Sequence, residues 1–346
     1  MTPGDAVNSS NSVRQAIAPE AVVAVIVVNF RTPELTIDCL RSLEREVGDL
    51  RGIRVFVVEN GSGDDSGQRI EEHIARSGWA EWCKLLISAN NRGFAGGTNF
   101  GIEAAIRSGG ARYFLLLNSD TLVASGCLAR CIRTMDSNQR IGALSCRVLN
   151  ADGSTQNVCR RFPTPLRCFV SALLLPWRLP SWFSWADCED LGWDRNSCAR
   201  DVEWIGGAFM MLRATWIAQH GALDDRFFFY GEDVEICHRV WQTGFRCHYD
   251  PAGTITHLGG GSSDPSRMAA DALGFHQWRG RYLIQQICYG KLSRLLAQVV
   301  DLLTVVRRIT WGYVTGQSAS SHYTAAKDTF QFLIRNWNEW GRRAGG

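Results

Sequence analysis

The sequence predicts an α/β fold in which a mainly parallel sheet lies between helices. Continuous runs of β-branched and other apolar residues alternate with helical spacing in the first third of the chain, and polar clusters follow three of these runs. Unbroken apolar runs are typical of parallel strands that helices cover on both faces. Ligands of such sheets bind at the carboxyl ends of the strands, so the polar clusters indicate one shared site.

Local patterns place the elements along the chain. Strands are expected where short apolar runs are bounded by polar residues, and helices where apolar residues recur at every third or fourth position. The expected strands are 21–30, 54–58, 83–88 and 113–117, and the expected helices are 33–45 and 100–108. Three more helical stretches are expected at 278–289, 292–309 and 323–340.

The length and composition of the chain limit the classes to which it can belong. Its 346 residues suffice for one large domain with an appended region, and we expect a disordered leader at 1–18, a main domain at 19–270 and a helical C-terminal region at 271–346. The 37 basic and 34 acidic residues give a formal charge of +3. This small net charge does not indicate a nucleic-acid-binding protein.

Cysteine usage and hydropathy point to a cytosolic protein. The chain has twelve cysteines but no Cys-x-x-Cys pair and no secretory signal peptide, which indicates reduced, mostly buried thiols. The adjacent pairs Cys237-His238 and Cys247-His248 lack the spacing of a zinc site. The longest apolar run, from Cys168 to Trp177, is far shorter than the ~20 residues needed to span a bilayer.

Two adjacent carboxylates are expected at the start of a helix. Phe227 to Tyr230 would form a strand, Gly231 the turn, and Glu232 with Asp233 the first helical turn. The free N–H groups and the dipole of a helix start favour ionised carboxylates. This pair therefore suits a general base or a metal ligand.

The segment that follows contains a second candidate. The helix is expected to end at Gly244, with Glu235 and Arg239 paired four residues apart on its outer face. His257 then follows a second short strand and precedes three glycines. An isolated histidine is often a structural hydrogen-bonding group, and its position alone leaves that alternative open.

Three polar clusters are expected to converge at one edge of the sheet. They are Asn29-Phe30-Arg31 after the first strand, Glu59-Asn60-Gly61-Ser62 after the second, and Asn118-Ser119-Asp120 after the fourth. Because turns favour such residues in any case, a single cluster is weak evidence for a site. Three clusters at the same edge of the sheet are stronger evidence.

Seven motifs occur in order along the chain. They are VIVVNF (25–30), VVENGSGDDS (57–66), NRGFAGGTNFGI (91–102), LLLNSDTLV (115–123), GGAFMMLR (206–213), FFFYGEDVEICHR (227–239) and HLGGGS (257–262). As a set, they resemble the family-2 glycosyltransferases, in particular their rhamnosyltransferase and galactofuranosyltransferase-like branch. The resemblance implies the nucleotide-diphospho-sugar transferase (GT-A type) fold, an α/β/α sandwich, with a divalent cation and inversion at the sugar carbon. It also implies a nucleotide-binding half at 19–123 and an acceptor and catalytic half at 124–270.

The resemblance assigns roles to individual residues. Asp233 matches the family's catalytic base, and Glu232 is expected to orient the acceptor. Asp120 is expected to hold Mg²⁺ or Mn²⁺ against the donor diphosphate, with His257 as the second protein ligand. Many relatives have two acidic residues after the fourth strand, where this chain has a single carboxylate.

Donor and acceptor residues follow from the same match. The residues expected to bind the donor nucleotide are Val28, Asn29, Phe30, Glu59, Asn91, Arg92, Gly93, Gly97, Asn118, Ser119 and Asp120. Glu59 would accept the N3–H of uracil or thymine, at a position where the family usually has Asp. The acceptor is expected against Trp204, Gly206 and Gly207.

Structural alternatives stay open for several of these features. The glycine-rich loop could only pack a helix against the sheet, and Gly206, Gly207 and Trp204 could serve packing. The two acids could be charges that stabilise a helix start. The aromatic stretch 163–193 could be an acceptor lid, a lipid-facing patch or an ordinary loop. The basic and apolar C-terminal helices could touch an anionic membrane, pack on the main domain or pair two copies.

We therefore expect an inverting, metal-dependent glycosyltransferase. It would move a sugar, rhamnose or a related one, from a dTDP- or UDP-sugar to a hydroxyl of a cell-surface glycan or lipid-linked saccharide, in the cytoplasm or at the inner face of the membrane. Two other functions stay open: a sugar-phosphate nucleotidyltransferase, whose N-terminal activation loop is not evident, and a non-catalytic nucleotide-sugar-binding protein. The set of Asp120, Asp233 and His257 disfavours the second.

Overall fold

A computed structural model describes residues 21–174, 185–190, 192–259, 270–316 and 321–340. The expected leader at 1–18 lies outside the described residues, as do Trp177, Trp182 and Phe183 of the aromatic stretch. Residues 260–262 of the HLGGGS motif and parts of the expected C-terminal region, 317–320 and 341–346, also lie outside them.

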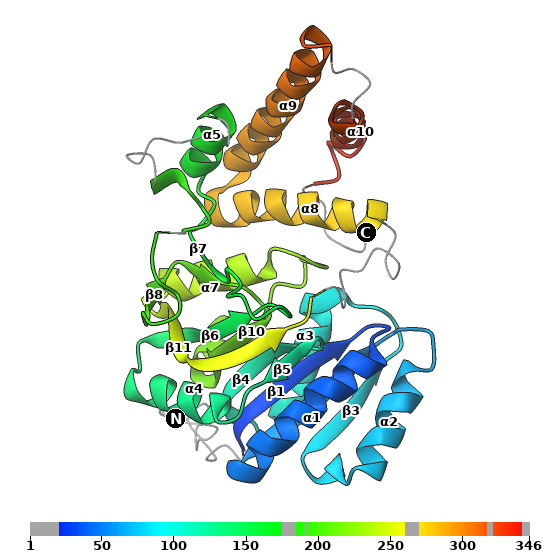
Figure 1. Cartoon of the computed structure of the whole chain (residues 1–346), viewed down its shortest axis with the longest axis vertical. Coiled ribbons are helices and arrows are strands. Elements are labelled where there is room, and N and C mark those ends of the chain that lie inside the picture. Colours follow the sequence, from blue (N-terminus) through cyan, green and yellow to red (C-terminus); the bar gives the residue numbers. More distant parts are fainter. Residues whose placement is uncertain (1–20, 175–184, 191, 260–269, 317–320, 341–346) are drawn as a thin grey trace, which may run out of the picture.

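The first half of the chain alternates strands and helices as expected. Its elements are β1 (Ala21–Asn29), α1 (Pro33–Asp49), β2 (Ile53–Asn60), α2 (Ser66–Arg76), the 3₁₀ turn η1 (Trp79–Glu81), β3 (Cys83–Ser88), α3 (Gly93–Arg107) and β4 (Ala111–Asn118). The four strands are parallel and lie in the order β3-β2-β1-β4. Helices α1 and α2 cover one face of this sheet and α3 the other (Figure 1), which accounts for strands that are apolar at nearly every position.

The second half extends the same sheet. Its elements are β5 (Thr121–Val123), α4 (Cys127–Ser137), β6 (Ile141–Leu149), β7 (Cys159–Arg160), α5 (Pro165–Leu174), β8 (Arg200–Val202), β9 (Trp204–Ile205), β10 (Phe209–Arg213), α6 (Ala214–His220), α7 (Glu232–Gln242) and β11 (Arg246–His257). The order continues β4-β10-β6-β11-β5, with β8 also paired to β11, and gives nine strands over the described residues. Strand β10 is antiparallel to both of its neighbours, so the sheet is mixed but mainly parallel. Strands β7 and β9 form a small separate pair.

The expected strand at Phe227–Tyr230 is wrong. These residues form a series of bends, because their backbone bonds to a helix start instead of a sheet. The Phe228 carbonyl oxygen accepts the N–H of Phe94 at 2.7 Å. A Cβ at Gly93 would lie 2.1 Å from the same oxygen, and one at Gly280 would lie 2.2 Å from the Tyr230 carbonyl oxygen. Two glycines on different helices therefore hold this segment from two sides.

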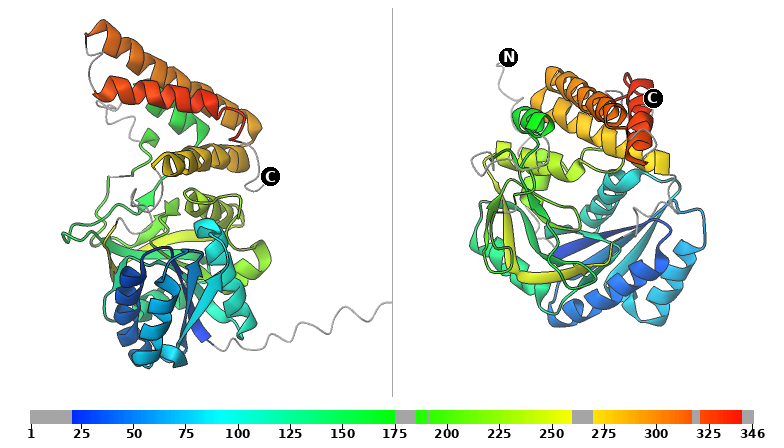
Figure 2. Two further views of the ribbon diagram at one scale, coloured as in Figure 1. Left: turned by 90° about the vertical axis from the view of Figure 1, so that its right-hand side faces the viewer. Right: turned by 45° about the horizontal axis from the view of Figure 1, so that its top comes forward.

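Three helices follow the sheet. They are α8 (Ala270–Tyr289), α9 (Lys291–Val314) and α10 (Ser321–Arg335), close to the expected stretches (Figures 1 and 2). They share a second apolar cluster built on Tyr282, Ala297, Val305, Leu333 and Trp340. A two-pronged ion pair between Arg281 and Asp301, with N–O distances of 2.8 and 3.0 Å, joins α8 to α9.

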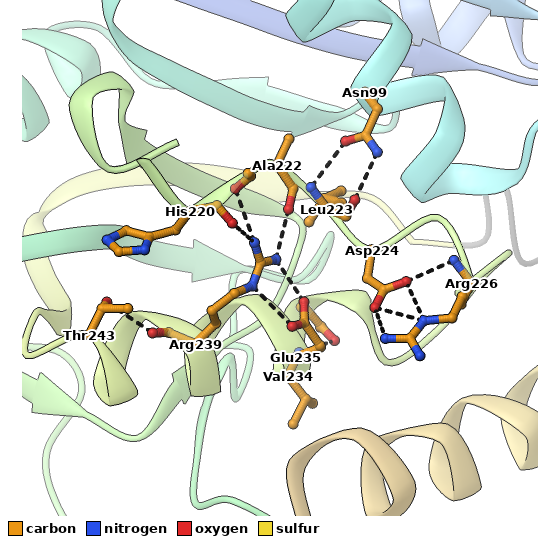
Figure 3. A network of polar contacts seen from close by, with 12 residues as sticks. Asn99, His220, Ala222, Leu223, Asp224, Arg226, Val234, Glu235, Arg239 and Thr243 are labelled. Atoms are coloured by element: carbon orange, nitrogen blue, oxygen red, sulfur yellow. Dashed lines mark hydrogen bonds and ion pairs between the residues drawn. The ribbon is translucent and has the colours of Figure 1, made fainter. Parts of the chain in front are cut away.

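Arg239 ties α7 to the loop that precedes it (Figure 3). Its guanidinium pairs with Glu235 at 2.8 Å and donates to the carbonyl oxygens of His220, Gly221 and Ala222 at 2.6 to 3.1 Å. The expected ion pair is confirmed. The expectation that it lies on the outer face of the helix is wrong, because Glu235 is buried against that loop. Burial raises the pKa of Glu235, although Arg239 opposes the shift.

Replacing Arg239 should destabilise the fold strongly. In Arg239→Met the buried Glu235 carboxylate and three carbonyl oxygens lose their donor, so the free energy of unfolding should fall by about 3–5 kcal/mol. Urea denaturation followed by tryptophan fluorescence measures this change.

Arg107→Met is the matched control. Arg107 pairs with Glu103 at the same spacing, but both side chains are 64% exposed, so the change should stay within ~0.5 kcal/mol. Equal losses for the two variants would show that the Arg239 network does not hold the loop.

Candidate functional site

A cavity of about 510 Å³ opens between the sheet, α7 and α8. Seven of the expected site residues line it: Asn118, Trp204, Gly206, Gly207, Glu232, Asp233 and His257. The cavity is also lined by Phe94, Gln156 and Arg160. Helix α8 contributes four residues, Gln277, Arg281, Ile284 and Gln285. The sequence did not indicate that α8, in the expected C-terminal region, would form a wall of this cavity.

Asp120 and His257 lie in direct contact at the edge of the cavity. Strand β5 begins directly after Asp120 and pairs antiparallel with β11, with Thr121 opposite His257. This register places Asp120 Oδ1 3.2 Å from His257 Nε2. Both side chains are largely buried, so neither carboxylate nor imidazole is freely hydrated.

Gln156 orients the imidazole. Its Oε1 lies 3.0 Å from His257 Nδ1, and an amide oxygen only accepts, so Nδ1 carries the proton. The lone pair of Nε2 is then directed towards the Asp120 carboxylate, with Asn118 Nδ2 at 3.4 Å. Sequence reasoning missed Gln156, because a glutamine outside every motif carries no signal of this role.

The Asp120–His257 pair fits a divalent cation. The carboxylate oxygen and Nε2 face each other at 3.2 Å, so a positive charge between them is favourable, and either a proton on Nε2 or a bound cation supplies it. Cis ligands of an octahedral ion with bonds of about 2.1 Å lie roughly 3 Å apart, which matches this separation. A carboxylate oxygen and a neutral imidazole with its second nitrogen bonded to a carbonyl form a suitable donor set for Mn²⁺.

The two acids at the start of α7 have different surroundings. Asp233 Oδ1 accepts the N–H of Val234 at 2.9 Å, and its carboxyl also accepts the N–H of Gly207. Glu232 is buried, and its Oε2 has no hydrogen-bond partner among the described residues. Two donors from other residues therefore favour the charged form of Asp233, whereas only the backbone N–H of Glu232 itself opposes the effect of burial on the Glu232 carboxyl group.

Burial separates the protonation states of these acids. Desolvation, followed by the charge of Asp233, raises the pKa of Glu232 to about 8. Desolvation also raises the pKa of Asp233, but the N–H groups of Val234 and Gly207 and the charge of Arg160 oppose that shift. At neutral pH the pair consists of a protonated Glu232 and the more readily ionised Asp233.

Gly206 and Gly207 are not required by packing. A Cβ on Gly207 would meet Phe94 and Asp233 at 3.9 and 4.0 Å, and one on Gly206 would find nothing closer than 3.8 Å. Trp204 uses its indole N–H on the Arg161 carbonyl oxygen at 2.9 Å, and Arg160 lies over its ring. The room around both glycines leaves their backbone open to the cavity, while Trp204 is partly occupied by protein contacts.

The glycine-rich loop packs closely on its surroundings. Gly97 lies against Val28 and Asn60, where a Cβ would approach to 3.1 Å. Asn60 fixes the loop, donating to Asn91 Oδ1 at 3.1 Å and accepting the N–H of Arg92 at 3.1 Å. The Arg92 side chain turns away, bonding to Ser88 Oγ at 3.0 Å and lying over the Phe100 ring. These contacts support the packing alternative for the loop.

The remaining expected donor residues divide into two groups. Val28, Phe30, Asn91 and Gly93 line a smaller hollow of about 30 Å³, which shares Phe94 with the main cavity. Asn29 at the end of β1, Glu59 near the end of β2 and Ser119 directly after β4 are buried instead.

Each buried member of that second group has a hydrogen-bond partner within the protein. Asn29 Oδ1 accepts the Thr36 hydroxyl at 2.9 Å, and the Ser119 hydroxyl lies 3.3 Å from that of Thr32. Glu59 Oε1 accepts the N–H of Ser62 at 2.7 Å. These three side chains therefore stabilise the ends of the strands through hydrogen bonds within the protein.

The Cys-His pairs do not form a metal site. His238 packs edge-on against Phe162, whereas His248 Nδ1 lies 2.7 Å from Asp201, so the pairs have separate neighbours. Over the described ranges, the three thiols close enough to share an ion are Cys127, Cys131 and Cys146, all buried under Gly253. They lie within the core, where thiols pack as small apolar groups.

Comparison with known proteins agrees with this geometry. Residues 24–184 match the family model described as Glycosyl transferase family 2. The N-acetylglucosaminyl-diphospho-decaprenol L-rhamnosyltransferase of Mycobacterium tuberculosis is 25% identical over 215 residues, which are 60% of this chain and 67% of that protein. The low-salt glycan biosynthesis hexosyltransferase Agl10 of Haloferax volcanii is 23% identical over 288 residues, 81% of each chain.

Solved structures share the fold. The mannosyltransferase PcManGT from Pyrobaculum calidifontis, in complex with GDP-Man and Mn²⁺, aligns over 94% of this chain and 88% of its own, with a TM-score of 0.54 and 13% identity. GalNAc-T7 with UDP, GalNAc and Mn²⁺ aligns over 91% of this chain and 54% of its own, with a TM-score of 0.53 and 13% identity. The expected α/β fold of the GT-A type is confirmed.

The protonation of Glu232 should make stability depend on pH. Its pKa is raised from 4.5 to about 8, so its contribution is fully present below about 4.5 and is lost as pH rises through 8. The free energy of unfolding should therefore fall across this interval, and Glu232→Gln should reduce the slope. The raised pKa of Asp233 acts in the same direction, so some slope should remain.

Urea unfolding at intervals from pH 5 to 9 measures the slope, with Glu103→Gln as the control. Glu103 is 64% exposed, so its replacement should leave the pH profile unchanged. Identical profiles for wild type and Glu232→Gln would contradict a protonated Glu232.

Proposed function

We propose that this chain, a family-2 glycosyltransferase, moves a sugar from a uridine or thymidine diphosphate donor to a hydroxyl of a glycan or lipid-linked saccharide, with inversion at the sugar carbon. The observation that carries the proposal is that Asp233 and His257 line one cavity, with Asp120 in contact with His257. A metal-binding pair and a base on the same cavity are the two elements that such a transfer needs.

The names of relatives narrow the donor and the acceptor. One relative is a rhamnosyltransferase whose name includes a diphospho-decaprenol acceptor. This supports rhamnose or a related sugar as the donor sugar, and a lipid-linked saccharide as the acceptor. The two carboxylate oxygens of Glu59 have acceptor capacity beyond the bonds to Gly61 and Ser62, so this residue remains our candidate for the N3–H of the base.

Asp120 and His257 are the residues that would hold Mg²⁺ or Mn²⁺. When bound, the ion would supply positive charge to the leaving diphosphate. Gln156 holds the proton on Nδ1 of His257, which keeps Nε2 available as a ligand.

Asp233 and Glu232 would have different roles towards the acceptor. Asp233, with the N–H groups of Val234 and Gly207 favouring its charge, takes the proton of the attacking hydroxyl. Glu232, protonated at neutral pH, donates a hydrogen bond into the cavity and orients the acceptor. Arg160 adds a positive charge near Asp233, which helps to keep it ionised before the proton arrives.

The proposed function is tested by a panel of nucleotide sugars. Release of nucleoside diphosphate should require Mg²⁺ or Mn²⁺ and should be greatest with a dTDP- or UDP-sugar. Asp120→Ala should abolish release, because Asn118 supplies no negative charge, and His257→Ala should lower it by about 10- to 100-fold.

Gln156→Ala serves as the graded variant in this assay, with an expected loss smaller than that of His257→Ala and a weaker apparent affinity for Mn²⁺. Full activity in EDTA, or an unchanged metal titration for His257→Ala, would remove the metal from the proposal.

Asp233 and Glu232 should respond differently to amide substitution. Asp233→Asn should reduce transfer by ~10²-fold or more with metal and donor binding nearly intact, because an amide cannot accept a proton at neutral pH. Glu232→Gln should reduce transfer less, since the amide keeps a donor where the protonated acid has one. Rates come from product formation, and donor affinity from calorimetry.

The alternative outcomes are distinct. An active Asp233→Asn with an inactive Glu232→Gln would reverse the two roles. Full activity of both variants would make this helix start structural.

A further inference from the structure

Helix α9 carries an unpartnered row of apolar side chains. The exposed members are Leu292, Leu295, Leu296, Val299, Leu303, Val306, Tyr313 and Val314, each between 41% and 73% exposed. At about 100° per residue they fall within an arc of roughly 100°, and at 1.5 Å per residue the row is about 33 Å long. Such a row is far longer than the scattered single apolar residues of an ordinary surface.

The opposite face of α9 makes the packing contacts. Ala297 and Val305 belong to the second apolar cluster, and Asp301 is bound by Arg281 of α8. Gly312 lies against the Tyr323 ring of α10, where a Cβ would come within 2.8 Å. These positions lie about half a turn from the exposed row. Helix α5 also packs against α9 (Figure 1), and with α5, α8 and α10 in place the members of the row remain 41–73% exposed.

The charge on α9 favours an anionic partner. The helix has four cations, at Lys291, Arg294, Arg307 and Arg308, and Asp301 is its one acidic residue. Lys291 and Arg307 flank the row, roughly 70–90° from its centre. Arg294 and Arg308 lie on the side of Asp301, where Arg294 donates to Gln298 Oε1 at 2.9 Å. Because Asp301 is buried in its ion pair, no carboxylate of α9 opposes the cations at the surface. A second copy of the same face would bring like charges together, whereas anionic lipid headgroups would neutralise them.

The end of α9 has the composition of a membrane interface. Trp311 and Tyr313 are 67% and 73% exposed, and these two residue types concentrate at the boundary between lipid and water. None of the helices in the described ranges is both long and apolar enough to cross a bilayer. An amphipathic helix of this type lies in the plane of the interface, with its apolar face among the acyl chains.

We propose that the exposed row of α9 docks the protein on the surface of a bilayer containing anionic lipid. The apolar side chains enter the boundary of the acyl chains, and Lys291 and Arg307, which flank the row, contact the headgroups. Helix α8, bound to α9 through Arg281 and Asp301, lines the cavity of the site. Docking therefore holds that cavity near the membrane surface. The binding itself does not depend on the proposed glycosyl transfer.

The test is co-sedimentation of the full chain with vesicles, at 0.15 M salt. Wild type should bind vesicles of phosphatidylcholine with about 30% phosphatidylglycerol, and at least 10-fold more weakly vesicles of phosphatidylcholine alone. The double variant Leu296→Gln with Leu303→Gln should lose at least 10-fold in affinity for the anionic vesicles. Both side chains are more than half exposed, so the fold should tolerate the change, and circular dichroism checks this.

The matched control is Ile87→Gln with Ile106→Gln. These two side chains are 60% and 53% exposed but lie on β3 and α3, and their replacement should leave vesicle binding unchanged. Lys291→Glu with Arg307→Glu should remove the preference for anionic lipid.

Several results would overturn the proposal. They are a wild-type chain that does not bind anionic vesicles, equal binding by wild type and the leucine variant, and a concentration-dependent dimer that the leucine variant abolishes in the absence of any vesicle binding. The last result would assign the row to a second copy of the chain. Because no outcome involves turnover, failure here is separate from failure of the proposed transfer.

Discussion

The pairing of β5 with β11 is the constraint on which the site depends. It sets Thr121 opposite His257 and so brings the Asp120 carboxylate beside the imidazole. Strand β11 is also paired along its other edge with β6, where an irregularity between Asp250 and Thr254 shifts the register. A slip of one residue would turn His257 to the opposite face of the sheet and separate the pair. The register of two strands thus decides whether two residues distant in sequence form the pair that we propose to hold the metal.

The start of α7 is also fixed by contacts between segments that are far apart in the sequence. The segment before it lies between the α3 start and α8, and the loop further upstream is fixed by Arg239 (Figure 3). The clamped segment turns through a left-handed residue, Tyr230, with φ of 71°, and then Gly231 with φ of 103°. Left-handed backbone at a tyrosine is costly and persists only where surrounding contacts enforce it. This arrangement presents Glu232 and Asp233 to the cavity at the cost of burying a carboxyl group.

Residue patterns predicted the parts of this structure that have local causes. The parallel strands and the helices between them were evident from apolar runs, whereas the set of Asp120, Asp233 and His257 followed from the family that the motifs resemble. The strand at Phe227–Tyr230 was wrong because its backbone bonds to Phe94, a contact between segments far apart in sequence. For the same reason the sequence could not reveal the buried side of Glu235 or the α8 wall of the cavity. Long-range contacts of this kind produce no periodic pattern of apolar residues, so they cannot be predicted from the sequence in the way that helices and strands can.

The most direct test of the account is the coordination of the metal by His257. Electron spin echo spectroscopy of Mn²⁺ bound to the protein with uridine diphosphate detects nitrogen nuclei attached to the ion. The account predicts modulation from one directly bound nitrogen in the wild type, which is lost in His257→Ala. A nitrogen-free spectrum for the wild type, with Mn²⁺ shown to be bound, would contradict the role given to the Asp120–His257 pair.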